Sequence, residues 1–243
     1  MITKVFGPPG SGKTTFLLNV VEKELADNTL SSQIGYFSFT RKAAGEARDR
    51  AIQKFPSLNA ETDFPWFRTL HSLAYHCLGA GAKDLMSAED YATFAKETGL
   101  EVSTSLEGDE YIVRADNAIL NEINIARIRG IDLRAHYNRS NMDIEWFYFE
   151  FVERAYRKFK AAHMLMDFTD LLERLIEQDE RLPALEVLIV DEAQDLSRLQ
   201  WKLVMALSEK ADRTFIAGDD DQAVYTWSGA DVESFLTCEG EVK

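Results

Sequence analysis

The chain has little cysteine, little positive charge and no long apolar segment. Its two cysteines, Cys77 and Cys238, lie far apart without metal-ligand spacing, so we expect reduced thiols in a cytoplasmic protein and no disulfide framework. No apolar run reaches membrane-spanning length, and the first residues lead straight into a strand pattern. We therefore expect no membrane partner and no signal peptide.

Positive charge is outnumbered, with 27 Lys and Arg against 41 Asp and Glu and a net charge of −14 among 243 residues. This balance argues against a protein that coats nucleic acid through bulk electrostatics. A local basic track stays possible, because screening is short-ranged and phosphate contacts are few. Basic residues slightly outnumber acidic ones between residues 111 and 163, where either a solvated helical face or such a track would explain them.

What is present begins with a glycine-rich segment after the apolar run Ile2–Phe6, which fits the phosphate-binding P-loop pattern without a mismatch. Its glycines can adopt conformations that turn successive N–H groups onto phosphate oxygens. A helix beginning near Lys13 adds its positive dipole end, Lys13 adds a charge at the β- and γ-phosphates, and Thr14 adds a hydroxyl for Mg²⁺. The predicted nucleotide-binding residues are Gly7, Pro8, Pro9, Gly10, Ser11, Gly12, Lys13, Thr14 and Thr15.

The two ends of the chain alternate apolar strands with helix-like segments, which predicts an α/β fold with a parallel sheet and helices on both faces. The expected strands are Ile2–Phe6, Ile34–Thr40, Val187–Asp191 and Arg213–Gly218. From about Gly79 to His163 we expect no strand, and helical periodicity covers Ser87–Glu97, Val113–Arg129 and Asp143–His163. We therefore predict an α/β domain of residues 1–80 and 164–243, interrupted by an all-helical insertion of residues 81–163.

The last of these helices is rich in aromatic side chains: Trp146, Phe147, Phe149, Phe151, Tyr156 and Phe159. Packing in a small helical core is the favoured interpretation, with base stacking as the alternative.

An acidic pair follows the apolar strand of residues 187–190. Two acids at such a position are costly to bury without a cation. Downstream of a P-loop they resemble a Walker B site, in which Asp191 holds Mg²⁺ and Glu192 positions and deprotonates the attacking water. Gln222, after the next strand, could sense the γ-phosphate. The predicted catalytic residues are Lys13, Glu192 and Gln222, and the predicted metal ligands are Thr14 and Asp191.

Two aromatic residues, Tyr225 and Trp227, follow beside Gly229. Exposed aromatics near a phosphate sensor suit base stacking, whereas two core side chains would explain them equally well.

Six segments carry an ordered series of motifs: Gly7–Thr14, Phe37–Ala44, Thr69–Ser72, Met166–Leu172, Asp191–Asp195 and Gly218–Ala230. The series resembles motifs I, Ia and Ib, the Asp-Phe-Asp-Asp-Leu-Leu signature, and motifs II and III of the UvrD/Rep-type superfamily 1 DNA helicases. The resemblance covers nearly the whole chain.

The resemblance implies a RecA-like P-loop NTPase domain (1A) with a helical insertion (1B). Such enzymes use ATP and Mg²⁺ to move along single-stranded DNA, usually 3′ to 5′, and to unwind duplex at junctions, in the cytoplasm or at the nucleoid. By matching position, the DNA track would include Phe39, Thr40, Lys42, His71, Tyr225 and Trp227. A hydrogen-bonded structural pair with Ser72 is the alternative for His71. Asp167 and Asp170 are expected to cap a helix and pack rather than to catalyse.

The family would continue past Lys243 into a second RecA-like domain, which supplies arginine fingers and the other half of the DNA track. We expect that domain in cis, the chain being a fragment, or otherwise in trans. A half-helicase that binds nucleotide or DNA without turnover is the alternative. A small-molecule kinase or GTPase explains neither the Asp-Glu-Ala-Gln segment nor the aromatic pair, and the chain has no Asn-Lys-x-Asp sequence.

Overall fold

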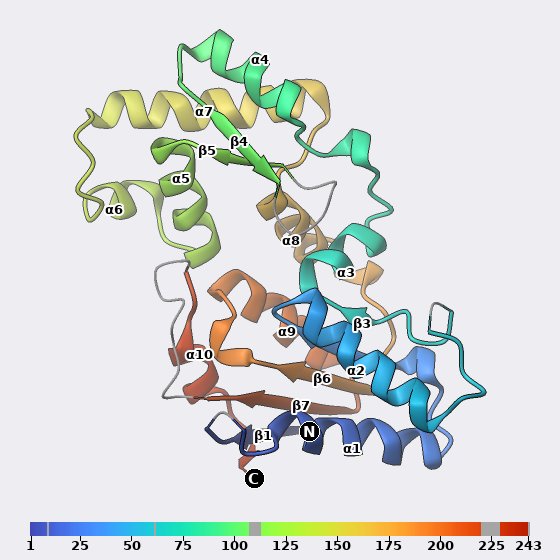
Figure 1. The fold of residues 1–243 in the computed structure, drawn as a ribbon. Helices are drawn as coiled ribbons and strands as arrows, with labels where there is room; N and C mark the ends of the chain where they lie inside the picture. The colour runs from blue at the N-terminus through green and yellow to red at the C-terminus, as the bar shows by residue number, and fades with distance from the viewer. Residues whose placement is uncertain (9, 61, 107–112, 220–228, 243) are drawn as a thin grey trace.

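The computed structural model describes residues 1–243 apart from 9, 61, 107–112, 220–228 and 243. A six-stranded parallel sheet lies in the lower part of the molecule, in the order β3-β2-β6-β7-β1-β8. Its strands are β1 (Ile2–Phe6), β2 (Ile34–Ser38), β3 (Phe67–Arg68), β6 (Val187–Asp191), β7 (Arg213–Gly218) and β8 (Glu241–Val242). The predicted α/β fold with a parallel sheet is confirmed (Figure 1).

Three strands have the predicted bounds, and β2 is two residues shorter than predicted. It ends at Ser38 because Thr40 is the N-cap of α2, where its side chain accepts a hydrogen bond from the Ala43 N–H at 3.2 Å. The two-residue strands β3 and β8 were not predicted, because two residues are too few to show a period.

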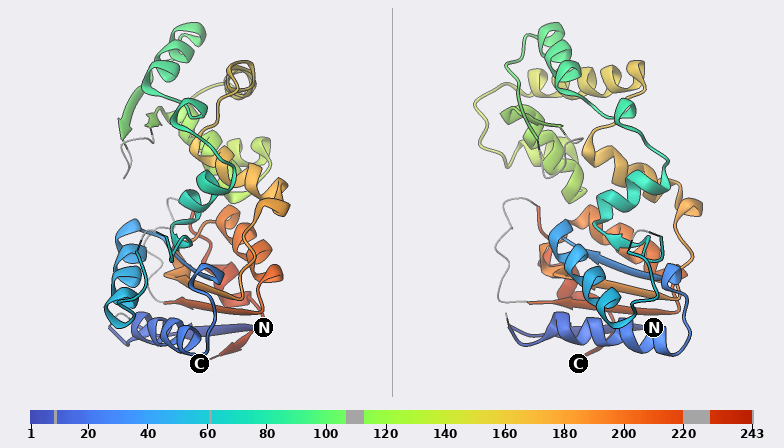
Figure 2. Two further views of the ribbon diagram at one scale, coloured as in Figure 1. Left: turned by 90° about the vertical axis from the view of Figure 1, so that its right-hand side faces the viewer. Right: turned by 45° about the vertical axis from the view of Figure 1, so that its right-hand side comes forward.

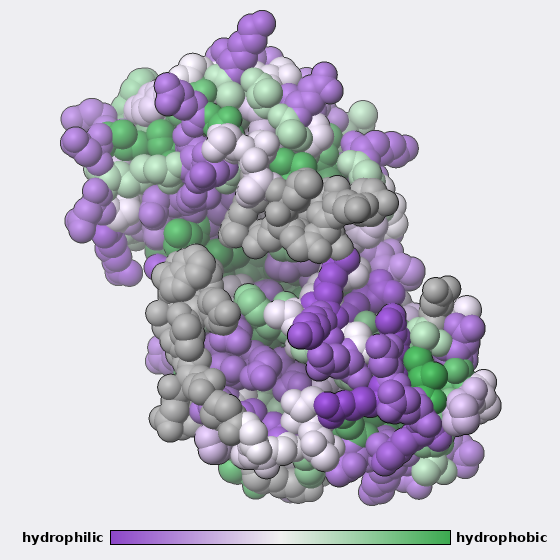
Figure 3. All heavy atoms as spheres, in the orientation of Figure 1, coloured by the Kyte–Doolittle hydropathy of each residue, from purple (hydrophilic) through white to green (hydrophobic). Residues whose placement is uncertain are grey.

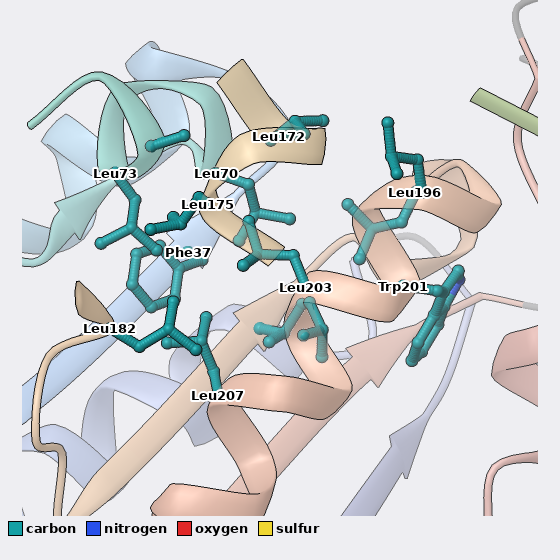
Figure 4. Packing of buried hydrophobic residues seen from close by; sticks show 14 of the residues in the cluster. Phe37, Leu70, Leu73, Leu172, Leu175, Leu182, Leu196, Trp201, Leu203 and Leu207 are labelled. Atoms are coloured by element: carbon teal, nitrogen blue, oxygen red, sulfur yellow. The ribbon is translucent and has the colours of Figure 1, made fainter. Parts of the chain in front are cut away.

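Helices cover both faces of the sheet. On one face, α1 (Lys13–Ala26) and α2 (Arg41–Lys54) enclose an apolar cluster that includes Leu17, Ile34 and Ile189. The other face carries α3 (Leu70–Cys77), α8 (Phe168–Glu177), α9 (Arg198–Lys210) and α10 (Val232–Thr237). Leucines from these helices pack around Phe37 of β2 in Figure 4. Both faces of the sheet are therefore covered, which suits the four consecutive apolar residues, Val187 to Val190, that precede Asp191 in β6.

Short 3₁₀ turns connect several elements: η1 (Ser31–Gln33), η2 (Ala82–Asp84), η3 (Asp179–Arg181) and η4 (Ala193–Asp195). Both chain termini lie at the end of the molecule away from the insertion (Figures 1 and 2). Within the described ranges, no helix combines the length and apolar character needed to cross a membrane.

The insertion stands above the sheet and has its own apolar core (Figures 1 and 2). Its helices are α4 (Ala88–Thr98), α5 (Ala118–Arg129), α6 (Leu133–Tyr137) and α7 (Trp146–His163). The prediction of no strand here was wrong, because β4 (Ser103–Leu106) and β5 (Val113–Asp116) form an antiparallel pair. The helix predicted from Val113 begins at Ala118, because the Asn117 side chain caps it by accepting from the N–H groups of the second and third helical residues.

The aromatic residues of α7 divide between core and surface. Phe149, Tyr156 and Phe159 are buried in the insertion core, as the core interpretation predicts. Phe147 is 79% exposed and Phe151 is 47% exposed, so the same interpretation is wrong for these two. Helical geometry accounts for the split, since positions 147 and 151 are four residues apart on the face opposite the core.

The two segments that connect the sheet domain to the insertion run side by side and are hydrogen-bonded to each other. The Met86 N–H donates to the Met166 carbonyl at 2.9 Å, and the Met166 N–H donates to the Asp84 carbonyl at 2.8 Å. Leu85 and Met166 belong to the core below, whereas Met86 and Leu165 belong to the core of the insertion. We propose that the boundary between the sheet domain and the insertion lies between Leu85 and Met86 on the way out and between Leu165 and Met166 on the way back. These positions are close to the expected insertion of residues 81–163.

Candidate functional site

The glycine-rich loop connects β1 to α1 at the carboxyl end of the sheet. Gly10 and Gly12 have φ of 74° and 93°, a region that disfavours other residues, and Gly12 is the N-cap of the 14-residue helix α1. A Cβ on Gly7 would lie 2.3 Å from the Ser11 hydroxyl oxygen, so a larger residue there would force the Ser11 side chain to move. The loop thus presents the amino end of a helix to solvent, a geometry that attracts anions.

The Lys13 side chain lies back across this loop. Its ammonium group donates to the carbonyl oxygens of Gly7 and, at 3.3 Å, of Pro8. Thr14 and Thr15 follow at the exposed start of α1, and Ser11 is also exposed. Pro9 lies outside the described residues.

Asp191 ends β6 and is 2% exposed. Its Oδ2 accepts hydrogen bonds from the Thr14 hydroxyl at 3.2 Å and from the Tyr36 hydroxyl at 2.7 Å, while its Oδ1 accepts from the Glu192 N–H at 3.0 Å. Burial raises the pKa of Asp191, and the hydroxyl of Tyr36 opposes that shift. The structure therefore brings the two predicted metal ligands, 177 residues apart in sequence, into direct contact.

Oxygen ligands of this kind suit Mg²⁺, which is usually bound through one or two carboxylates together with phosphate oxygens and water. The carboxylate of Asp191 and the hydroxyl of Thr14 lie beside the loop predicted to bind phosphates, so the residues present fit a Mg²⁺–nucleotide site.

Glu192 has an unusual backbone for a residue with a side chain, with φ 54° and ψ 44°. Such a conformation costs of the order of 1–3 kcal/mol and is kept where the surrounding structure enforces it. The Gln194 side chain holds the residue in place, because its amide nitrogen donates to the Glu192 carboxylate at 2.8 Å. The Gln194 amide oxygen accepts from the Asp219 N–H at 3.0 Å, at the end of β7.

The site thus contains two residues that sequence reasoning did not assign. Gln194, 3% exposed, joins the ends of β6 and β7, and its signal was an amide in the Asp-Glu-Ala-Gln segment. Tyr36 contacts Asp191 from β2, and its signal was a phenol hydroxyl in the middle of a fully buried strand. Burial, with the charge of Asp191, raises the pKa of Tyr36 far above its usual range, so this hydroxyl keeps its proton and acts as a donor.

Asp195, in the same segment, is a half-buried acid. Burial, together with the charge of Glu192, raises the pKa of Asp195 to about 6. Its Oδ1 has no hydrogen-bond partner among the described residues.

Three of the predicted DNA-track residues that the structure describes lie near the end of β2. Phe39 is half-buried, Thr40 caps α2, and Lys42 is exposed in the first turn of that helix. Strongly hydrophilic side chains gather over α2 in the middle of Figure 3. His71, on α3, stacks on the ring of Phe168, with ring centroids 3.6 Å apart and planes inclined by 7°.

The remaining predicted residues, Gln222, Tyr225 and Trp227, lie outside the described residues, so the choice between base stacking and core packing for the two aromatics stays open.

Asp167 and Asp170 form the capping box of α8, which confirms the prediction that they cap a helix. They also belong to a charged cluster with Arg127 of α5 and Lys160 of α7. Arg127 donates to Asp167 and to Glu173, each at 2.7 Å, and Lys160 donates to Asp167 at 2.5 Å. Although burial alone would raise the pKa of Asp167, Arg127 and Lys160 hold it well below its usual range. The cluster ties two helices of the insertion to α8.

A parallel sheet with a glycine-rich loop after β1 and an acidic pair at the end of a buried strand is the arrangement of P-loop nucleotide-binding proteins. Comparison with known proteins narrows this class. The family model described as the UvrD/REP helicase N-terminal domain matches residues 2–243. The chain therefore belongs to the UvrD/Rep helicase N-terminal domain family, a family that implies nucleotide use.

Individual relatives agree with the family. The chain is 29% identical over 247 residues to DNA helicase II of Haemophilus influenzae, covering 95% of this chain and 33% of that protein. It is 26% identical over 239 residues to the ATP-dependent DNA helicase Rep of Buchnera aphidicola, with 93% and 34% covered. It is 25% identical over 255 residues to the ATP-dependent DNA helicase PcrA of Bacillus subtilis, with 95% and 32% covered. The chain spans about a third of the length of these relatives.

Proposed function

We propose that this chain is the ATP-binding and ATP-hydrolysing N-terminal motor domain of a DNA helicase. The observation that carries the proposal is the contact between Thr14 and Asp191 at 3.2 Å beside the glycine-rich loop. Two segments at opposite ends of the chain meet there in the geometry that a Mg²⁺–triphosphate site needs. Membership of the family and the names of the relatives, which are ATP-dependent DNA helicases in two cases, favour ATP and DNA as ligands.

Each residue has a distinct role in this proposal. The loop from Gly7 to Thr15 binds the phosphates, and Lys13 leaves the loop carbonyls to pair with the β- and γ-phosphates. Thr14 and Asp191 would hold Mg²⁺, which when bound neutralises charge on the phosphate oxygens. Glu192 orients the attacking water and accepts its proton at the carboxylate, and Gln194 fixes that carboxylate in place. Gln222 would sense the γ-phosphate.

The proposed DNA track runs over the end of β2 and the start of α3, along Phe39, Thr40, Lys42 and His71. Tyr225 and Trp227 would add stacking surfaces for single-stranded DNA. Stacking of His71 on Phe168 orients the imidazole of this proposed track residue. We further propose movement 3′ to 5′, unwinding at duplex junctions, and a cytoplasmic or nucleoid location.

A second RecA-like domain, in cis or in trans, would complete the motor. Arginine fingers supplied from a facing domain account for roughly 10³–10⁵ in turnover. Translocation also needs two domains that close and open around the nucleotide.

The nucleotide site is tested by calorimetric titration of the chain with ATP in the presence of Mg²⁺. Lys13→Ala is expected to abolish binding while the fold persists, because within the described residues the Lys13 ammonium donates to loop carbonyls and pairs with no carboxylate. The control is Lys23→Ala, which removes an equal charge from the last turn of the same helix. Equal affinity in Lys13→Ala and the parent would refute the P-loop assignment.

A separate measurement of ATP hydrolysis distinguishes the two candidate functions. Binding of ATP without any hydrolysis, in a chain completed by the second domain, would favour the half-helicase alternative.

A further inference from the structure

Tyr36 places a hydroxyl in the middle of the fully buried strand β2. It lies on β2 opposite Ile189 of β6, and the side chain is 0% exposed. Ile34, Val187 and Ile189 of the same cluster are apolar and buried, and Ser38, two residues further along β2, is a buried polar residue. A buried hydroxyl costs free energy unless it is hydrogen-bonded, so the Tyr36 hydroxyl needs a partner. That partner is Asp191 Oδ2, at 2.7 Å.

The tyrosine ring is fixed in place by its surroundings. It stacks on Phe67 of β3, with centroids 5.5 Å apart and planes inclined by 19°. Its own backbone N–H donates to the Trp66 carbonyl at 3.0 Å. The ring therefore delivers the hydroxyl to one position, and the direction of the hydrogen bond is set before any ligand binds.

The three hydrogen bonds to Asp191 come from donors of different kinds: a backbone N–H, a predicted metal ligand and the Tyr36 hydroxyl. The bond from the Glu192 N–H is local and fixes only Oδ1. Thr14 donates to Oδ2, but its oxygen is itself a predicted metal ligand. Tyr36 donates to Oδ2 from β2 and is not itself a predicted metal ligand.

We propose that Tyr36 is a positioning residue for the Mg²⁺ site, whose hydroxyl holds the Asp191 carboxylate facing Thr14. The proposal rests on the proposed function. Partners that orient a metal ligand typically change metal affinity by about 10–100-fold when removed. Affinity for nucleotide without metal depends on the loop and is expected to stay unchanged.

Tyr36→Phe tests the proposal, because it removes the hydroxyl and keeps the ring that packs on Phe67. Dissociation constants for ATP are measured by calorimetry twice, with excess Mg²⁺ and with EDTA. The dissociation constant in EDTA divided by that in Mg²⁺ reports how much Mg²⁺ tightens binding, without any need for turnover. We expect this ratio to fall about tenfold or more in Tyr36→Phe, with the dissociation constant in EDTA unchanged.

Tyr91→Phe is the matched control. Tyr91 is 3% exposed, and its hydroxyl is hydrogen-bonded to the Tyr156 hydroxyl at 3.1 Å in the core of the insertion. This variant loses a buried hydroxyl far from Asp191, so its ratio is expected to equal that of the parent. Phe67→Leu loosens the ring of Tyr36 without removing a hydroxyl and is expected to give a smaller loss in the same direction. It keeps the proposal testable if Tyr36→Phe does not fold.

The outcomes separate the two claims. A parent that binds Mg²⁺–ATP more tightly than metal-free ATP, with the same ratio in Tyr36→Phe, overturns the role of Tyr36 and leaves the proposed function standing. An equal fall in Tyr36→Phe and Tyr91→Phe also overturns it, since the effect would then be general. A parent that binds no ATP with or without Mg²⁺ refutes the proposed function and, with it, the role of Tyr36.

Discussion

Replacing Arg127 with methionine should destabilise the protein through the charged cluster that joins the insertion to α8. The guanidinium pairs with three carboxylates, those of Asp167, Asp170 and Glu173, and its side chain is 20% exposed. Removing one partner of a buried ion pair typically costs about 3–5 kcal/mol, because the other charge is left uncompensated. Lys160 still pairs with Asp167 and Asp170 in this variant, which lowers the expected loss to about 2–3 kcal/mol.

Urea denaturation measures this loss directly, and a chain of this size should also lose roughly 5–10 °C in melting temperature. Arg154→Met is the control, because Arg154 is 66% exposed and pairs along its own helix with Glu150 at 2.8 Å. An exposed pair of this kind contributes about 0.3–0.5 kcal/mol. If Arg127→Met loses less than about 1 kcal/mol, or no more than Arg154→Met, the cluster does not hold the two parts together.

The same prediction has a definite pH dependence. The folded-state pKa of Asp167 is depressed, so its contribution is fully present above the unfolded pKa of about 4 and is lost as the pH falls through the folded value. Because Arg127 helps to depress that pKa, the difference in stability between the parent and Arg127→Met should be largest near neutral pH. It should shrink as the pH falls below about 4. A difference that grows on acidification would contradict the assignment of charges.

Two further predictions concern aromatic residues. Tyr225→Ala and Trp227→Ala should each weaken binding of single-stranded DNA by about 1–3 kcal/mol in fluorescence titrations, with little dependence on sequence or moderate salt; a fall in melting temperature with unchanged DNA affinity would assign these rings to the core. Phe149→Ala, at a fully buried position of α7, should cost about 3–5 kcal/mol of unfolding free energy, and Phe147→Ala, at a 79% exposed position, should cost under about 0.5 kcal/mol. Equal losses in urea denaturation would contradict the packing of that helix.

The sequence predicted the sheet well because its strands are short apolar runs bounded by clear signals. The bounds of β1, β6 and β7 were predictable from an apolar run together with the glycine or acidic residues at its end. The pair β4 and β5 was not, because four-residue strands with mixed polarity show too little period to distinguish them from a helical start.

Some residues of the candidate site could likewise be predicted from the sequence, and others could not. The motifs identified both predicted metal ligands, since Thr14 follows the glycine-rich loop after β1 and Asp191 is the last residue of the apolar strand β6. The role of Tyr36 depends on the register of β2 against β6, which pairs Tyr36 with Ile189, two residues before Asp191. Register between strands that are 150 residues apart has no local signal in a single sequence.

The charged cluster of Arg127, Lys160, Asp167, Asp170 and Glu173 could not be predicted either, because Arg127 is distant in sequence from the other members. The capping box of Asp167 and Asp170 is local and could be predicted from their spacing. The cations that neutralise the pair come from α5 and α7, and Arg127 lies 40 residues upstream of Asp167. Only the folded arrangement of the insertion brings these charges together.

The most direct test of the central claim is steady-state ATP hydrolysis by this chain with and without single-stranded DNA, repeated after a second RecA-like domain is supplied. The account predicts that the chain alone binds Mg²⁺–ATP, hydrolyses it slowly or not at all, and separates no strands. Adding the second domain should raise the DNA-stimulated rate by orders of magnitude, and Glu192→Gln should abolish that gain. Robust DNA-stimulated hydrolysis by the chain alone as a monomer, or a gain that survives Glu192→Gln, would contradict the account.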